Sequence, residues 1–186
     1  MITIKKVYIT NILPLLNKDV YQYYYDRVGE YRQNKANKLV SDIDKARSVG
    51  AGAVLRFAIE DSTNYNYDKL RFSIGKNGKP YVEDEPFYFS LSHSGDYAVC
   101  AISDTPIGVD IEQETELSEK FRKRFADSIV DWTKKEAKGK LTGNGFFDST
   151  EDSFVYTHKK EDGYIITVCS DEKVTEFLYY HLPFPC

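Results

Sequence analysis

The chain has 186 residues and a mass of 21.4 kDa, which suits one ordinary domain or two small fused halves. Its 25 basic and 29 acidic residues give a formal charge of −4, which excludes the concentrated basic field that general nucleic-acid binding needs. Hydrophobic residues make up 41% of the chain and aromatic residues 15%, far more packing material than a disordered chain carries.

Several features predict a soluble protein of the reducing cytoplasm. No apolar run approaches the ~20 residues that a membrane-spanning helix needs. The opening MITIKKVYITNILP lacks the apolar segment and small-residue cleavage site of a secretory signal. Cys100, Cys169 and Cys186 are widely spaced, so they predict neither a disulfide framework nor a zinc site, and the first two are expected to be buried.

The first third of the chain predicts one strand and two helical regions. A strand is expected over 2–10, and a helix over 17–38 with a break near Gly29. A second helix is expected to begin at Ser41, whose hydroxyl would cap the first turn, with Asp44 three residues on. Its expected buried face consists of Ile43, Ala46, Gly50, Ala53, Val54 and Phe57.

The rest of the chain predicts strands around one long helix. Segments 71–75 and 80–82 flank Asn77-Gly78, a strong hairpin signal because Gly tolerates positive φ. Short strands are expected over 87–91, 97–102 and 107–111, a helix over 117–141, and closing strands over 154–157, 164–169 and 174–180.

A weak internal sequence similarity relates two of these strands. Segments 95–103 and 162–170 each contain a turn, a Tyr, apolar residues, a Cys and a Ser. Duplication explains this likeness, and chance similarity between two hairpin strands explains it almost as well. The predicted fold class is α+β, with two pseudo-symmetric halves, 1–105 and 106–186, each a small antiparallel sheet packed with a long helix.

The densest group of chemically useful residues is the segment PIGVDIE over 106–112. Side chains alternate along a strand, so Asp110 and Glu112 face one way while Val109 and Ile111 enter the core. Paired carboxylates repel unless a cation lies between them, and such oxygen ligands suit Mg²⁺. For this pattern alone, an acidic solvent-facing strand is the commoner explanation.

Two further clusters also allow ordinary explanations. Glu136 and Lys140 are four residues apart and share one helix face. Glu136 could be a metal ligand and Lys140 a donor to a phosphate, or the two could form an ordinary surface ion pair. Ser92, His93 and Ser94 lie where a strand enters a turn, which suits a phosphate-binding loop or a capped turn. A serine hydrolase is disfavoured, because adjacent strand residues point apart and no G-x-S-x-G elbow is present. Each of Arg32, Lys35, Arg47 and Lys79 alone indicates only a solvated face.

In combination, these motifs resemble the 4′-phosphopantetheinyl transferases. The chain carries G-K-P-Y, then S-x-S-H-S-G, then GVDIE, and finally a helix with W-x-x-K-E-A-x-x-K that is followed by G-x-G. This is the order of the motifs in that family, and the resemblance covers about 32–145. The resemblance is to the fused, pseudo-dimeric type that activates peptide and polyketide synthases. That type carries coenzyme A contacts in its first half and the metal strand and W-x-x-K-E-A helix in its second.

The resemblance implies a role for each matching residue. Mg²⁺ would be held by Asp110, Glu112 and Glu136, and Lys140 would contact a pyrophosphate or leaving-group oxygen. The adenine pocket would be lined by Lys79 and Pro80, and the coenzyme A 3′-phosphate would meet Ser92 and His93. Further phosphate contacts would come from Arg32, Lys35, Arg47 and Ser48.

The implied reaction transfers the 4′-phosphopantetheine arm of coenzyme A to a serine of an apo carrier protein and releases adenosine 3′,5′-bisphosphate. Glu136, directly or through a bound water, is the expected base, with Asp110 and Lys140 also in catalytic positions. The acidic acyl or peptidyl carrier is expected to dock on the basic segment 120–125, which is equally explained as a solvated helix.

Two other functions stay open beside the transferase. A non-enzymatic coenzyme A-binding relative would explain the short segment 113–131 as a trimmed carrier-docking surface. A Mg²⁺-dependent phosphodiesterase would use the same carboxylates but would leave G-K-P-Y and S-H-S-G without a role. Fused halves favour a monomer over a trimer.

Overall fold

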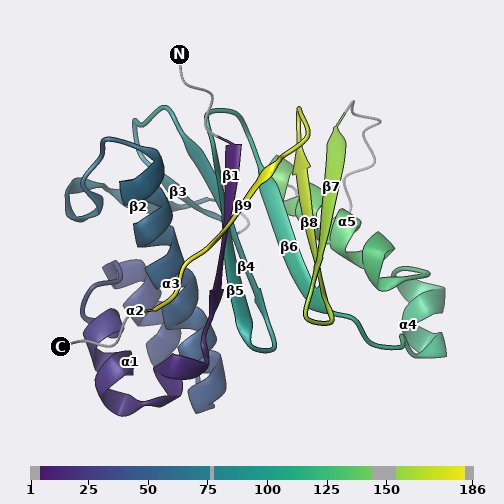
Figure 1. The fold of residues 1–186 in the computed structure, drawn as a ribbon, viewed down its shortest axis with the longest axis horizontal. Helices are drawn as coiled ribbons and strands as arrows, with labels where there is room; N and C mark the ends of the chain where they lie inside the picture. The colour runs from purple at the N-terminus through teal and green to yellow at the C-terminus, as the bar shows by residue number, and fades with distance from the viewer. Residues whose placement is uncertain (1–4, 76–77, 144–153, 183–186) are drawn as a thin grey trace.

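The computed structural model describes residues 5–75, 78–143 and 154–182 and shows a mixed α+β molecule of two lobes (Figure 1). The first lobe contains β1 (Lys5–Asn11), α1 (Lys18–Tyr25), α2 (Glu30–Asn37), α3 (Asp42–Ser62), β2 (Phe72–Ile74), β3 (Pro80–Val82), β4 (Tyr88–Ser94) and β5 (Tyr97–Ser103), with 3₁₀ turns at Leu13–Leu16 and Tyr67–Lys69. The second contains β6 (Gly108–Gln113), α4 (Glu119–Arg124), α5 (Ile129–Thr142), β7 (Val155–Glu161) and β8 (Tyr164–Ser170).

Each lobe has its own sheet. The first sheet has the order β4-β5-β1-β9, the second has the order β6-β8-β7, and β2 and β3 form a separate hairpin. The last strand, β9 (Glu176–Tyr179), returns to the first lobe and pairs parallel with β1, with Lys6 opposite Glu176. The first sheet therefore contains one parallel strand in addition to the antiparallel strands that the sequence predicted.

The two sheets pack against each other through alternate apolar side chains. Val7 and Ile9 of β1 share one core cluster with Val109 and Ile111 of β6, and all four are 0–1% exposed. The opposite face of the first sheet packs on α3, and α5 covers the outer face of the second sheet (Figure 1). The layers are therefore helix, sheet, sheet and helix, and the alternation predicted for 107–111 is confirmed.

The turns of two hairpins meet where the lobes join. The ring centroids of Tyr97 and Tyr164 lie 5.1 Å apart in an edge-to-face arrangement, and the Tyr164 hydroxyl accepts a hydrogen bond from the Asp96 amide at 3.1 Å. Gly95 is required in this turn because its φ is +52° and a Cβ would lie 1.9 Å from the Tyr164 hydroxyl. The two similar segments, 95–103 and 162–170, thus contain the inner strands β5 and β8 of the two sheets, and they contact each other through Tyr97 and Tyr164.

Most of the predicted elements are present. The helical region over 17–38 forms α1 and α2 on either side of Gly29, and the expected hairpin forms between β2 and β3. Of its turn, Asn77 lies outside the described residues, while Gly78 has a φ of +80°. Cys100 and Cys169 are buried, as predicted, and Cys186 lies outside the described part. None of the helices described is long and apolar enough to cross a membrane.

The extent of one predicted helix is wrong, and so is the capping of another, although α3 begins directly after Ser41 as predicted. The helix expected over 117–141 is divided at Phe125–Ser128, because the Ser128 hydroxyl accepts the Asp131 amide at 3.1 Å and starts a new helix. The S-x-x-D spacing of Ser128 and Asp131 is the signal for this start. At Ser41 the hydroxyl makes no capping hydrogen bond, and only its carbonyl accepts the Lys45 amide, at 3.0 Å.

Backbone contact between β6 and α5 fixes the helix over the strand. A Cβ on Gly108 would lie 1.9 Å from the Ala137 carbonyl oxygen and 2.6 Å from the Leu141 amide nitrogen. Only glycine allows this approach, and the short distance brings the side chains of α5 close to those of β6.

We expect Gly108→Ala to lower the free energy of unfolding by about 2 kcal/mol, because the added methyl group must push α5 away from β6. In thermal denaturation this loss corresponds to a Tm lower by about 4–8 °C. Gly75→Ala is the matched control, since its Cβ would lie 3.3 Å from the Lys79 carbonyl oxygen. Equal Tm values for the two variants would contradict the close contact.

Candidate functional site

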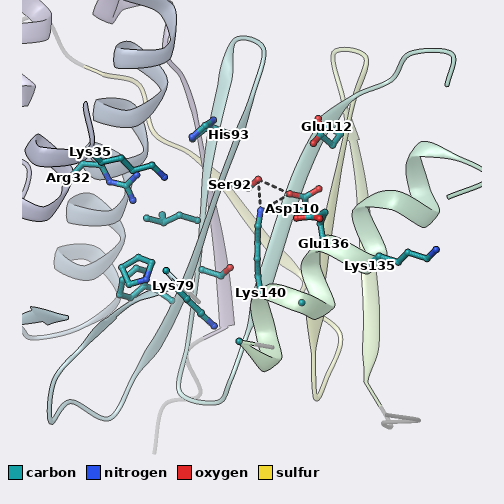
Figure 2. A pocket seen from close by; sticks show the side chains of 17 residues that line it. Arg32, Lys35, Lys79, Ser92, His93, Asp110, Glu112, Lys135, Glu136 and Lys140 are labelled. Atoms are coloured by element: carbon teal, nitrogen blue, oxygen red, sulfur yellow. Dashed lines mark hydrogen bonds and ion pairs between the residues drawn. The ribbon is translucent and has the colours of Figure 1, made fainter. Parts of the chain in front are cut away.

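A cavity of about 430 Å³ lies between the lobes and is lined by both (Figure 2). Strand β4 and helix α2 form one wall, and β6 and α5 form the other. Most of the charged residues singled out in the sequence line this cavity: Arg32, Lys35, Lys79, His93, Asp110, Glu112, Glu136 and Lys140. Ser92 and Pro80 line it too.

The acidic wall is built by one strand and one helix. Asp110 and Glu112 are two residues apart on β6 and therefore face the same side, whereas Glu136 comes from α5. Asp110 is only 2% exposed, and Glu112 and Glu136 are half-buried. The tertiary structure thus brings together three carboxylates that are separated by up to 26 positions in the sequence.

The buried Asp110 carboxylate has partners on only one of its oxygens. Asp110 Oδ1 accepts hydrogen bonds from Lys140 Nζ at 2.6 Å and from Ser92 Oγ at 2.8 Å, and Lys140 Nζ also donates to Ser92 Oγ at 2.9 Å (Figure 2). Asp110 Oδ2 is buried and has no hydrogen-bond partner. An unpartnered buried carboxylate oxygen is costly, so this atom is the best-placed acceptor for an additional ligand.

The other two carboxyl groups are held closer to neutrality than usual. Burial raises the pKa of Glu112, the negative charge of Asp110 raises it further, and a hydrogen bond from Ser94 opposes the rise. Burial and Asp110 likewise raise the pKa of Glu136, while Lys140 opposes them. Like charges that line one wall of a cavity are typical of a site that takes a cation.

The facing wall carries cations from the first lobe. Arg32 of α2 is 3% exposed, and its Nε has no hydrogen-bond partner. Desolvation, Arg32 and Lys140 lower the pKa of Lys35. Partial desolvation at the cavity rim, with the cations of Lys35 and Arg32, also lowers the pKa of His93, to about 4. This concentration of positive charge makes the wall a receptor for an anion.

The hairpin β2–β3 supplies the remaining cation. Burial lowers the pKa of Lys79 to about 8, and Lys79 Nζ donates to the Ile107 carbonyl oxygen at 3.4 Å. Pro80 lies beside it in the same wall. The segment G-K-P-Y therefore reaches the cavity from a hairpin that belongs to neither main sheet.

Two of the predicted residues do not line the cavity. Arg47 donates from Nε to the Gly95 carbonyl oxygen at 2.8 Å and from Nη1 to Asp44 Oδ1 at 2.9 Å, and its charge contributes to the low pKa of His93. Ser48 is fully buried on α3, and its hydroxyl has no partner. Direct phosphate contacts by these two residues stay a prediction.

The cavity and its surroundings also contain residues that the sequence analysis did not single out. Phe89, Leu91, Lys135 and Gly139 line it. Behind the acidic wall, Thr133 Oγ1 of α5 and Thr167 Oγ1 of β8 are 2.6 Å apart and fully buried, and Thr167 is the register partner of Asp110. The alternation of β8 could have indicated Thr167 as a polar residue on the α5 side.

The residues of the acidic wall fit a divalent cation that is shared with a substrate. Among the described residues, no group of three or more His, Cys, Asp or Glu side chains is placed to hold a metal ion unaided. Mg²⁺ commonly binds to one or two carboxylates and completes its shell with water and substrate phosphates. The unpartnered Asp110 Oδ2 and the oxygens of Glu112 and Glu136 provide hard ligands of this kind.

The basic segment 120–125 lies away from this cavity on α4. Arg122, Lys123 and Arg124 are exposed, and Lys123 forms an ion pair with Glu119 one turn earlier, at 2.6 Å. Behind them, Phe121 and Phe125 pack on Trp132, with ring centroids 5.1 and 5.8 Å from that ring. The aromatic residues attach α4 to α5 and leave the cations at the surface.

Comparisons with known proteins agree on one family. The model described as "4′-phosphopantetheinyl transferase, N-terminal" (AASDHPPT_N) matches residues 17–105. The 4′-phosphopantetheinyl transferase psf-1 of Bacillus pumilus is 34% identical over 122 residues, which are 55% of this chain and 52% of that protein. The 4′-phosphopantetheinyl transferase Sfp of Bacillus subtilis is 26% identical over 185 residues, 77% of this chain and 82% of that protein. A third, gsp of Aneurinibacillus migulanus, is 29% identical over 110 residues, 46% of its length.

Asp110→Asn is expected to lower the pKa of both Glu112 and Glu136 toward the ordinary value of a glutamate, because it removes the negative charge that raises them. Carboxyl ¹³C signals followed through a pH titration measure both groups in one experiment. Asp68, whose pKa is lowered by its hydrogen bond with Arg56, lies outside this cavity and serves as the internal control. Unchanged Glu112 and Glu136 titrations would show that the three carboxylates do not interact.

Proposed function

Because the chain belongs to the 4′-phosphopantetheinyl transferase superfamily, in its fused two-lobed type, we propose that it transfers the 4′-phosphopantetheine arm of coenzyme A to a serine of an apo carrier protein. The proposal rests on one observation, which is the distribution of charge between the two walls of the cavity. Cations of the first lobe face carboxylates of the second, which suits a substrate pyrophosphate bound between them.

In this proposal the first lobe binds the phosphates of coenzyme A. Arg32 and Lys35 would meet the phosphates, and an anion beside His93 would favour its protonated form. Ser92 is hydrogen-bonded to Asp110, so a contact of Ser92 with the 3′-phosphate would be additional to that bond. Lys79 and Pro80 would border the adenine, as the resemblance implies.

The second lobe would position the reacting groups. The carrier serine hydroxyl attacks the pantetheine-side phosphorus, the pyrophosphate bond breaks, and adenosine 3′,5′-bisphosphate leaves. Glu136 would accept the serine proton, and its raised pKa makes it a stronger base than an ordinary glutamate while it is ionised. Lys140 would stabilise negative charge on a pyrophosphate or leaving-group oxygen.

Asp110, Glu112 and Glu136 would hold Mg²⁺ in this site. The cation, when bound, supplies neutralisation of the charge on the pyrophosphate. Asp110 would contribute through Oδ2, since Oδ1 is already bonded to Lys140 and Ser92.

The direct test is intact-mass spectrometry of a panel of apo acyl and peptidyl carrier proteins with this protein, coenzyme A and Mg²⁺. We expect one carrier class to gain the phosphopantetheine mass, and EDTA or Glu112→Ala to prevent the gain. Coenzyme A binding without any gain across the panel would favour a non-enzymatic relative. Hydrolysis of free coenzyme A without a carrier would instead indicate a phosphodiesterase.

Asp110→Ala is expected to lower the transfer rate at saturating Mg²⁺ by at least about 100-fold, because the site loses its buried carboxylate. The fold should persist, since Lys140 is 28% exposed and can reach water when its partner is removed. Circular dichroism checks the fold. Thr10→Val, which removes a buried hydroxyl with no partner on β1, is the control. Unchanged turnover in Asp110→Ala would overturn the metal assignment.

Reversing the charges of α4 is expected to raise the KM for the acidic carrier by about tenfold, because α4 presents an exposed basic surface. The dissociation constant of coenzyme A should stay the same. The variant is Arg122→Glu with Lys123→Glu and Arg124→Glu. A control with the same charge change on exposed lysines of the first lobe is Lys18→Glu with Lys38→Glu and Lys69→Glu. Equal carrier KM values for the two triple variants would contradict docking on α4.

A further inference from the structure

Three serines at alternate positions of β4 face the neighbouring strand β6. Ser90, Ser92 and Ser94 share one side of β4 because side chains alternate along a strand. The strands β4 and β6 are the adjoining edges of the two different sheets. The strand pairings of the described chain include no backbone ladder between β4 and β6, so other groups hold these edges together.

Each serine bonds to a different group of β6. Ser90 Oγ accepts the Val109 backbone N–H at 3.1 Å. Ser92 Oγ donates to Asp110 Oδ1 at 2.8 Å, and Ser94 Oγ donates to Glu112 Oε2 at 3.0 Å. The contacts advance in the same direction along both strands, so the three hydroxyls form a continuous row between the lobes.

We propose that this serine row joins the two lobes and that Ser94 is a positioning residue, which holds the Glu112 carboxylate against β4 at the edge of the cavity. The role of Glu112 rests on the proposed function, whereas the hydrogen bonds of the row do not. The serine side chain has a single rotatable bond before its hydroxyl, so the backbone of β4 in the first lobe fixes the position of this donor to the Glu112 carboxylate.

The electrostatics of the site explain why Glu112 needs such a donor. Glu112 is half-buried, and the charge of Asp110 on the same face of β6 repels its carboxylate. A free glutamate side chain with three rotatable bonds would turn toward water. Hydrogen bonds from Ser94 and from the Trp132 side chain oppose that rotation and stabilise the charged form, Ser94 from the first lobe and Trp132 from α5.

The row also offers a comparison within one strand. Ser90 bonds to the backbone of β6, so Ser90→Ala tests the joining of the strands without removing a donor from a carboxylate. Ser94→Ala removes the donor to Glu112 and leaves the Ser90 bond. Ser94→Thr keeps a hydroxyl at position 94, and Thr10→Val is the control because it removes a buried hydroxyl that has no partner.

The experiment measures three quantities on these four variants and the parent protein. The Glu112 carboxyl ¹³C signal at one fixed pH reports its hydrogen bond, and exchange of the Val109 amide reports the bond to Ser90. Electron paramagnetic resonance with Mn²⁺ as the probe, in the presence of coenzyme A, reports cation affinity without a carrier. Positioning groups of this kind commonly change metal affinity by 10–100-fold.

We expect Ser94→Ala to shift the Glu112 signal and to weaken Mn²⁺ binding by about tenfold, with Val109 exchange unchanged. Ser94→Thr should restore both values, and Ser90→Ala should accelerate Val109 exchange. The proposal is overturned if Ser94→Ala leaves the Glu112 signal unchanged, or if it leaves Mn²⁺ affinity unchanged in a protein that binds Mn²⁺. A parent protein that binds no Mn²⁺ and modifies no carrier refutes the proposed function, and the Glu112 and Val109 signals then decide on the row.

Discussion

The buried carboxylate of Asp110 ties the site to the rest of the structure. A charge that is 2% exposed has to be compensated, and its partners come from both lobes: Lys140 from α5 and Ser92 from β4. Without the first lobe, Asp110 would keep its ion pair with Lys140 but would lose the hydrogen bond from Ser92, so the packing of the two lobes completes the set of partners around this charge. The close approach of Gly108 to the Ala137 carbonyl oxygen also contributes, because it places α5 near β6 and so brings Lys140 within reach of Asp110.

Each wall of the cavity carries charges that are not fully compensated within that wall. Burial and the charge of Asp110 raise the pKa of Glu112 and Glu136, while desolvation and neighbouring cations lower the pKa of Lys35 and His93 on the opposite wall. A bound pyrophosphate with a divalent cation would stabilise the charged forms on both walls, since it offers negative charge to the basic wall and positive charge to the acidic wall. The proposed transfer of phosphopantetheine uses this division directly.

Some of this organisation was predictable because it depends on local periodicity. The alternation over 107–111 placed Asp110 and Glu112 on one side of a strand, and the spacing of Glu136 and Lys140 placed them on one face of a helix. The helix boundary at Ser128 was missed although S-x-x-D is a local signal, because the apolar spacing continued through it. The hydroxyl of Ser41 was expected to cap α3 and does not, because a capping residue type allows this bond without requiring it.

The sequence by itself determined the family motifs, the residues with useful chemistry and the faces on which neighbouring residues lie, because these follow from side-chain type and from periods of two and 3.6 residues. Only the tertiary structure decided which oxygen of Asp110 stays unpartnered, that Ser90, Ser92 and Ser94 bond to β6, and that β9 returns to pair with β1. Those facts depend on contacts between segments far apart in the chain. Such contacts are set by the packing of two sheets against each other, which no local pattern specifies.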